Sequence, residues 1–330
     1  MMDFRTEVGF DSDFSIGYSD RLMMLGSCFT ENIGQKFTDS MLNVVVNPFG
    51  ILFNPESIAD AVERAIDGIH VTDADVFEHN GLWSGFGFHG SFSSASKSEA
   101  ISRMNAGIDL AHECIGKASK LILTFGTAFV YRLKDNGKIV ANCHKLPSDR
   151  FTREMLGVQS IVDRYALLID RLSGINPNMQ IILTVSPIRH LRDGAHQNQL
   201  SKSTLLLAVN SLVEKYGNVH YFPSYEIVLD DLRDYRFYDT DMVHPSGMAV
   251  DYIWQKLCSK CFSTSDLATM DDVRKLQSAL NHRPINPNTD EFRNFASRQL
   301  DFAKQLAQKH SDIDFSKAIG HWQEVIDARE

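Results

Sequence analysis

The sequence predicts an α/β protein with a parallel sheet covered by helices on both faces, a three-layer α/β/α arrangement of the flavodoxin-like type. Two observations support this fold class. Short apolar runs that are typical of buried strands recur up to residue 222, and amphipathic helical patterns lie between them. Because strand and helix alternate, right-handed crossovers would make the strands parallel in one sheet.

The strands are expected at several short, mostly apolar runs. These runs lie at residues 21–25, 44–46, 121–125, 181–185 and 219–222, and the run at 44–46 is the weakest. In open parallel sheets, ligands bind outside the carboxyl ends of the strands. The loops that follow these runs are therefore the segments in which a functional site is expected.

Two segments between the strands have the spacing of amphipathic helices. Apolar residues at 158–172 follow the i, i+3, i+4 pattern, and Gly174 is the expected C-terminal stop. A second pattern at 205–213 is expected to stop at Gly217. Residues 67–118, which are rich in Gly, Phe and His near their centre, are expected to form an excursion that returns to the sheet afterwards.

The chain is expected to consist of an α/β hydrolase-type domain, residues 1–262, and a helical C-terminal extension packed on it, residues 263–330. Strand-like runs cease near this boundary, and two helical patterns follow, the second at 290–310. A Pro-containing loop joins them. Asn288 or Thr289 is the expected N-cap of the second helix.

Composition argues against several classes of partner. The 33 basic residues are outnumbered by 42 acidic ones, the net charge is −9, and no segment gathers enough Lys or Arg to form a basic cluster. Nucleic acid is therefore not an expected partner. No run approaches the about 18 consecutive apolar residues of a membrane span, so no membrane partner is expected either.

The cysteines and the first residues point to a cytoplasmic location. Five cysteines are few and odd in number for 330 residues, which favours free thiols in a reducing compartment. The start of the chain carries acidic residues and no apolar run, unlike a secretory signal. Nothing in the sequence indicates an oligomeric state.

The first strand leads directly into Gly26-Ser27-Cys28 and then into a helix. A hydroxyl or thiol at this position would lie exposed at the edge of the sheet, where its own backbone N–H can stabilise an oxyanion. The helix dipole would also lower the pKa of a thiol there and raise its thiolate fraction. The alternative interpretation is a helix N-cap at Ser27 beside a buried cysteine.

A second candidate segment lies before the last helix of the α/β domain. In Asp241-Met-Val-His244, the spacing lets the carboxylate hold Nδ1–H of the imidazole and leaves Nε2 free to take a proton from a nucleophile. The alternative is a solvated loop with a helix cap at Ser246. An Asp-x-x-His pair becomes stronger evidence when a nucleophile follows the first strand.

These two segments and several others carry a family resemblance. The other matching motifs are NPFGILFNP at 47–55, FGTAFVY at 125–131, NCHK at 142–145, VSPIRHLRD at 185–193 and HRP at 282–284. With GSCF at 26–29, the chain resembles the GSCFA family over essentially its whole length. That family is similar to the SGNH/GDSL-type hydrolases, which implies an SGNH hydrolase-like fold and an ester-cleaving (acyl hydrolase) activity.

The resemblance also implies roles for individual residues. A gap-free match to the first GDSL motif puts Cys28 at the nucleophile position, with Ser27 as the alternative, and makes His244 the base and Asp241 its partner. Gly50 falls where a backbone N–H contributes to the oxyanion hole. Ala128 falls where relatives have Asn, and Thr127 or Asn142 are the candidates to replace that side chain.

The implied reaction needs no cofactor, and a carbohydrate O-acyl ester is the favoured small-molecule substrate by analogy with related hydrolases. Two rival functions remain open. One is an acyltransferase that passes a Cys28 thioester to an alcohol or amine. The other is a non-catalytic binding module on the same fold, which the missing Asn at Ala128 would allow.

Other polar residues have weaker assignments. Cys258 and Cys261 lie on an apolar helix stripe and are interpreted as core residues, and no metal site is expected. The substrate-lining candidates are His89, His144, Arg189 and His190. The last two follow a predicted strand, where they either recognise an anionic or polar substrate group or belong to a surface salt-bridge cluster.

Overall fold

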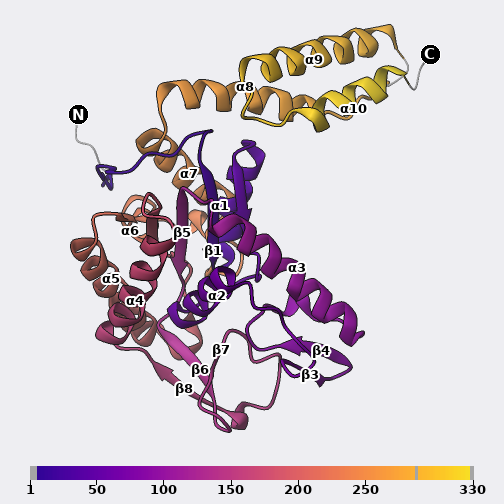
Figure 1. The fold of residues 1–330 in the computed structure, drawn as a ribbon. Helices are drawn as coiled ribbons and strands as arrows, with labels where there is room; N and C mark the ends of the chain where they lie inside the picture. The colour runs from indigo at the N-terminus through magenta and orange to yellow at the C-terminus, as the bar shows by residue number, and fades with distance from the viewer. Residues whose placement is uncertain (1–5, 287–288, 328–330) are drawn as a thin grey trace.

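Five parallel strands form the centre of the computed structural model, which describes residues 6–286 and 289–327. They are β1 (Arg21–Gly26), β2 (Asn43–Val46), β5 (Lys120–Phe125), β9 (Gln180–Val185) and β10 (Val219–Phe222). Their order across the sheet is β10-β9-β5-β1-β2. When only these strands are counted, this is the 2-1-3-4-5 order of flavodoxin-like folds. The predicted fold class and strands are confirmed (Figure 1).

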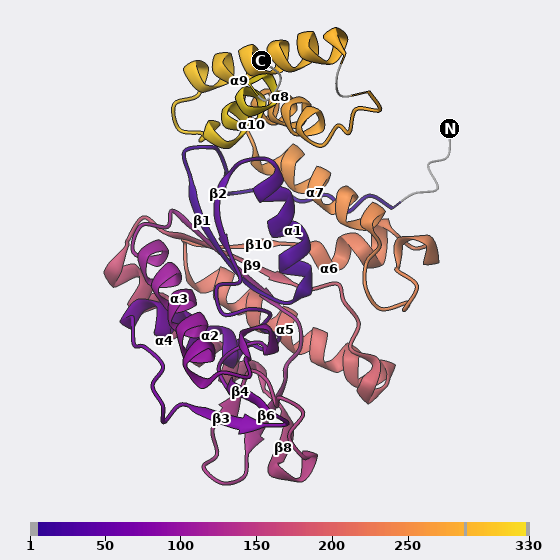
Figure 2. The same ribbon diagram turned by 90° about the vertical axis from the view of Figure 1, so that its right-hand side faces the viewer.

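Helices cover both faces of the sheet (Figure 2). One face carries α2 (Pro55–Asp67), α3 (Lys97–Ile115), α4 (Val158–Ile175) and α5 (Ala195–Lys215), and the other carries α1 (Cys28–Asp39) and α7 (Gly247–Cys261). Alternate residues of each strand pack into the two hydrophobic cores, one on each face of the sheet. In β1, Met23 and Leu25 face the first set of helices, whereas Leu22 and Met24 face the second.

Two β insertions extend the domain at the lower end of Figure 1. The first is the antiparallel hairpin of β3 (Val76–His79) and β4 (Leu82–Gly85), within the predicted excursion. The second is a three-stranded sheet of β6 (Phe129–Leu133), β7 (Ile139–Val140) and β8 (Phe151–Met155) that follows β5. Sequence patterns did not predict the second sheet, because β8 buries only its first residue and so lacks an apolar run.

The C-terminal region contains three helices, α8 (Thr264–Leu280), α9 (Asp290–Lys309) and α10 (Ser316–Asp327). Thr289 caps α9 as predicted, whereas Asn288 lies outside the described residues. The short α10 was not predicted. The three helices pack beside Tyr18 and Met41, which precede β1 and β2, so they lie at the amino edge of the sheet (Figure 1). None of the helices in the described ranges is both long enough and apolar enough to span a bilayer.

Two helix boundaries differ from the predictions. Gly174 does not stop α4, which continues to Ile175, because Asn176 supplies the cap by donating its N–H to the Leu172 carbonyl. The helix predicted at 205–213 begins much earlier, at Ala195. Its first half buries polar residues, among them Lys202, and therefore lacks the apolar pattern.

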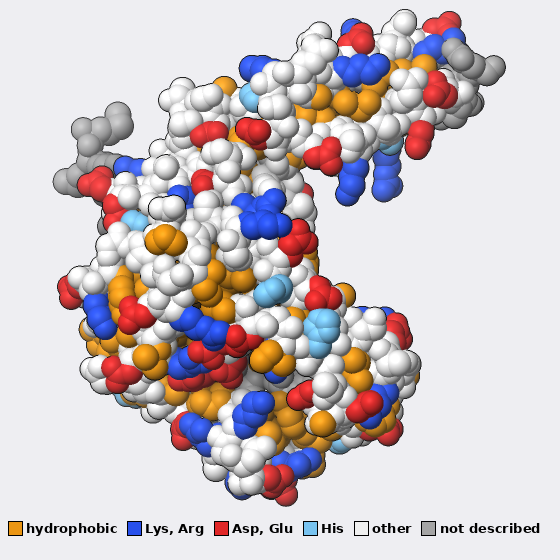
Figure 3. Space-filling model, viewed as in Figure 1, with side chains coloured by type: hydrophobic (Ala, Val, Ile, Leu, Met, Phe, Trp, Pro, Cys, Tyr) orange, Lys and Arg blue, Asp and Glu red, His pale blue; other side chains and the backbone are white. Residues whose placement is uncertain are grey.

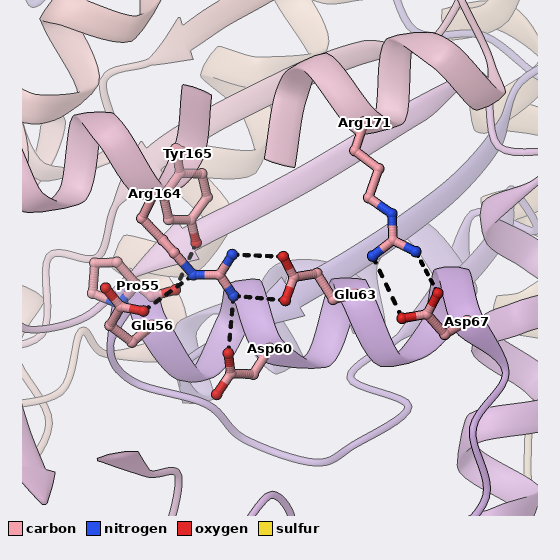
Figure 4. A network of polar contacts seen from close by, with 8 residues as sticks. All are labelled: Pro55, Glu56, Asp60, Glu63, Asp67, Arg164, Tyr165 and Arg171. Carbon is pink, nitrogen blue, oxygen red and sulfur yellow. Dashed lines mark hydrogen bonds and ion pairs between the residues drawn. The ribbon is translucent and has the colours of Figure 1, made fainter. Parts of the chain in front are cut away.

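Ion pairs join α2 to α4 across the surface of one helical layer (Figure 4). The Arg164 guanidinium, 19% exposed, lies 3.2 Å from Glu56, 2.9 Å from Asp60 and 2.6 Å from Glu63. A second pair links Arg171 to Asp67. The Arg164 guanidinium donates four hydrogen bonds to these three carboxylates, so its charge is balanced within the fold.

Candidate active site

The turn after β1 requires a glycine. A Cβ on Gly26 would lie 2.5 Å from Oγ1 of Thr30 and 2.6 Å from the carbonyl oxygen of Thr124, so no other residue fits without a shift of the backbone. The Gly26 N–H donates to Oδ1 of Asn47 at 2.9 Å, which ties this turn to the loop after β2. The close approach lets α1 begin at the carboxyl edge of the sheet.

Ser27 and Cys28 have different surroundings in this turn. Ser27 is 1% exposed, and its Oγ caps α1 by accepting a hydrogen bond from the Phe29 N–H at 3.3 Å. Cys28 is half-buried, and its Sγ lies 3.4 Å from Nε2 of His244. The thiol therefore faces the imidazole, and the hydroxyl is engaged in helix capping.

His244 is held by Asp241. Its Nδ1 lies 2.6 Å from Oδ2 of Asp241, while Oδ1 accepts the backbone N–H groups of Val243 at 2.8 Å and His244 at 2.9 Å. These hydrogen bonds lower the pKa of Asp241 to about 2, those from the two backbone groups most of all. A proton on Nδ1 then satisfies the carboxylate and leaves the Nε2 lone pair toward Cys28.

Burial raises the pKa of the Cys28 thiol, contrary to the lowering predicted from the helix dipole. The N–H groups of Cys28 and Phe29 do act in the predicted direction, but their effect is smaller than the cost of desolvating the thiolate. Nearby Glu31 and Asp241 raise the pKa further. The thiol is thus neutral at rest, and deprotonation depends on transfer to a base.

The three residues expected in the oxyanion hole have other partners in the structure. Gly50, at φ +75°, donates its N–H to the Asn47 carbonyl at 2.7 Å. Thr127 donates its N–H to the Phe53 carbonyl at 3.0 Å, and its Oγ1 lies 3.1 Å from Oγ of Ser201. Oδ1 of Asn142 accepts the backbone N–H of His144 at 2.8 Å. No contact within the described residues joins any of the three to Cys28.

His89 and His144 lie at the junction of the β insertions with the loop after β2. The Cβ of His89 is 2.4 Å from the place where a Cβ on Gly50 would stand, so this contact also requires glycine. Nε2 of His144 lies 2.9 Å from the Gly85 carbonyl, and burial lowers the pKa of this histidine. His89 thus borders the loop that contains Gly50, whereas the ring of His144 lies against Phe77 of β3.

Arg189 and His190 lie closer to Cys28 and His244. The Arg189 N–H donates to the Val243 carbonyl at 3.3 Å, immediately before His244. Burial, followed by the nearby charges of Lys202 and His244, lowers the pKa of His190 to about 4. His190 is therefore a neutral imidazole at pH 7.

Sequence analysis did not identify Lys202, Ser201 or Asn47 as site residues. Lys202 is fully buried, and its Nζ donates to the Gly126 and Ser186 carbonyls, at 2.6 Å each, after β5 and β9. Beside it, Oγ of Ser201 accepts the Ala128 N–H at 2.8 Å. Ser201 and Lys202 match no known sequence motif. The one available signal was their position just before the apolar stripe of α5.

The site is separate from a cleft of about 540 Å³ between α2 and the β insertions, in the lower half of Figure 3. Its walls include Phe77, Phe86 and Ile139, together with the carboxylates of Asp60 and Asp75. None of the site residues predicted from the sequence lines it. Cys258 and Cys261 also lie elsewhere, in the core beneath α7.

The fold places the chain in the flavodoxin-like class of three-layer α/β/α proteins. It belongs to the GSCFA family, whose model matches residues 21–257, and the model described as the C-terminal domain of GSCFA domain proteins matches residues 273–328. No curated protein matches the chain.

Two solved structures show distant similarity. One, from Streptococcus pneumonia, is provisionally assigned as a platelet activating factor; it is 12% identical over 73% of this chain and 83% of its own, with a TM-score of 0.39. The other is an acetyl xylan esterase from the rumen bacterium Butyrivibrio proteoclasticus, 15% identical over 74% and 64% of the two chains, with a TM-score of 0.31. Likenesses this distant carry no argument about function.

Proposed function

We propose that this protein hydrolyses an ester or other acyl bond, with Cys28 as nucleophile, His244 as general base and Asp241 as the residue that orients it. The observation that carries the proposal is the 3.4 Å contact between the Cys28 sulfur and Nε2 of His244, made at the carboxyl edge of the sheet. The helix cap at Ser27 supports the choice of the thiol over the hydroxyl.

In the first half-reaction, the Cys28 sulfur attacks the acyl carbon while its proton passes to Nε2 of His244. Asp241, ionised at all pH values above about 2, stabilises the resulting imidazolium through Nδ1–H. The tetrahedral intermediate collapses when the carbon–oxygen bond breaks and His244 returns the proton to the leaving alcohol. A thioester on Cys28 and a free alcohol result.

In the second half-reaction, water attacks the thioester as Nε2 of His244 takes its proton. The carbon–sulfur bond then breaks, the acid leaves, and Cys28 regains its proton. Side-chain exposures of 41% for His244 and 50% for Asp241 leave the base accessible to water. That exposure favours hydrolysis over transfer to another acceptor.

The oxyanion needs hydrogen-bond donors beside Cys28. The N–H of Cys28 supplies one at the start of α1, and the N–H of Phe29 supplies a second once it is released from Oγ of Ser27. Nδ2 of Asn47 is a further candidate, because it is buried without an acceptor on the loop that binds Gly26. The N–H groups of Gly50 and Thr127 would serve only after giving up their present acceptors, whereas Asn142 accepts its hydrogen bond through Oδ1 and so uses no donor in it.

Paired alanine substitutions test the assignment. Cys28→Ala should abolish hydrolysis of 4-nitrophenyl acetate and of an O-acetylated oligosaccharide, the carbohydrate ester class expected from the resemblance. Ser27→Ala, which removes only the cap, should retain turnover with a lowered melting temperature. The opposite result would move the nucleophile to Ser27, and full activity in both variants would contradict the proposal.

A further inference from the structure

Arg189 has no partner for its charge. It is half-buried, yet its side chain makes no ion pair or hydrogen bond with any described residue, and its Nε is buried without an acceptor. By contrast, Arg153 pairs with Asp193 at 2.5 Å, and three carboxylates surround Arg164. Leaving buried N–H donors of a guanidinium unmatched costs stability, so folding alone does not explain this arrangement.

A second unmatched donor lies next to it in the sequence. Nε2 of His190 is buried without a partner and lies 3.5 Å from the position of a Cβ on Gly126, at the end of β5. Its ring packs edge-on against Phe53, with 5.9 Å between ring centroids. Both unmatched donors therefore lie on the loop after β9. Through the Arg189 N–H, this loop is bonded to the segment that carries His244.

The local charge is positive and lacks a counter-ion. Burial lowers the pKa of Lys202 to about 7, and the charge of nearby Arg189 is the second cause of this fall. Cys28 is also close enough to act on Lys202, and it raises the pKa. The one carboxylate that acts on His190, Asp193, is already bound to Arg153. The salt-bridge interpretation of this cluster therefore applies to Asp193 but not to Arg189.

We propose that Arg189 and His190 form a binding subsite for an anionic group, a carboxylate or phosphate, carried by the acyl ester that Cys28 cleaves. The guanidinium offers two parallel donors to such a group. The neutral imidazole of His190 donates from Nε2, and Lys202, bound to the two carbonyls, adds a positive charge at pH values below about 7. This inference rests on the proposed hydrolase function and narrows its substrate class to anionic esters.

Two matched pairs of esters test the subsite and show which side of the ester bond carries the charge. Monoethyl adipate against ethyl hexanoate places a carboxylate on the acyl part, and 4-acetoxybenzoate against phenyl acetate places it on the alcohol part. For at least one pair, kcat/KM of the wild type should favour the anionic member about tenfold to a hundredfold. Arg189→Met should remove the preference, because kcat/KM falls far more for the anionic member of the pair than for the neutral one.

Arg192→Met is the matched control, since that arginine is exposed and its side chain bonds, among the residues that the structure describes, only to the Tyr131 hydroxyl. This variant should keep the preference. Equal kcat/KM for charged and neutral members in the wild type, or an intact preference in Arg189→Met, would overturn the subsite and leave the hydrolase standing. Unchanged hydrolysis in Cys28→Ala would instead refute the proposed function.

A binding measurement applies even if none of the four esters is cleaved. Sodium adipate or inorganic phosphate should raise the melting temperature of the wild type and of Arg192→Met, but not that of Arg189→Met. Stabilisation by adipate alone would identify a carboxylate subsite, and stabilisation by phosphate alone a phosphate subsite. The same response in all three proteins, or none, would overturn the inference.

Discussion

Arg164 and Arg189 are both partly buried arginines, but only the first is balanced by the protein itself. Arg164 joins α2 to α4 through Glu56, Asp60 and Glu63 (Figure 4), whereas Arg189, beside the loop that carries His244, meets no carboxylate among the described residues. The first arrangement stabilises the fold. The second retains a charge and donors that a ligand can use. Substitutions in the two regions should therefore separate stability from activity.

The largest effect on kcat is expected from substitution of His244, the proposed base for Cys28. His244→Ala should lower kcat by about 10³-fold or more, because no other base within the described ranges is hydrogen-bonded to the Cys28 thiol, while the melting temperature stays near that of the wild type. Steady-state kinetics and calorimetry on the same preparation check both values. Wild-type kcat in a folded His244→Ala protein would show that the region around His244 does not determine activity.

Asp241→Asn should have a smaller effect on kcat, about 10²-fold, since the amide still accepts the backbone hydrogen bonds but does not stabilise the imidazolium. KM should change little. Because the pKa of Asp241 is about 2, the acid limb of the wild-type pH profile should not report this group. An acid limb that vanishes in Asp241→Asn would show that the carboxylate itself titrates in the working range.

Arg164→Met should lower the free energy of unfolding by about 3 kcal/mol, because it leaves partly buried carboxylates without a cation. The matched control is Arg171→Met, whose more exposed pair with Asp67 should contribute under about 1 kcal/mol. Urea unfolding measures both. Both variants should keep wild-type kcat, and a loss of turnover without a loss of stability would contradict the structural role.

Lys202→Met should reveal a pH-dependent stability. Below pH 7 the cost of burying the ammonium is fully present in the wild type; between pH 7 and about pH 10 the folded side chain is neutral while the unfolded one still binds a proton. The stability of the wild type relative to Lys202→Met should therefore rise with pH across this range. A stability difference that does not change with pH across this range would show that Lys202 stays charged when buried.

The matched control for that measurement is Lys120→Met. Lys120 is also buried, but it bonds to Gln180 at the amino edge of the sheet. This variant should change stability without changing kcat/KM, whereas Lys202→Met should lower kcat/KM as well, because Gly126 and Ser186 lose their common donor.

Much of the fold was predictable because its signals are local. Each central strand is a short and mostly apolar run, and the loops after β1 and before α7 carry the short motifs that contain Cys28 and His244. The three-stranded insertion and the early start of α5 were not predicted. Most of β8 is exposed, unlike a core strand, and Lys202 is buried, unlike most lysines. These elements depend on tertiary contacts.

The candidate site was predictable in its residue types but not in its electrostatics. Spacing led to Cys28 and His244, yet the helix dipole suggested a lowered thiol pKa, and burial reverses that direction. Sequence also gave no sign that Gly50, Thr127 and Asn142 would have other hydrogen-bond partners. Desolvation and partner choice follow from the packed structure, which spacing does not encode.

The most direct test of the account is acid-quenched mass spectrometry of the protein mixed with excess 4-nitrophenyl acetate, followed by peptide mapping. The account predicts one acetyl group as a thioester on the peptide that contains Cys28, sensitive to hydroxylamine, absent from Cys28→Ala and strongly reduced in His244→Ala. Ser27→Ala should acetylate like the wild type. An oxygen ester on Ser27, or thioester formation that does not depend on His244, would contradict the claim that Cys28 is the nucleophile and His244 its base.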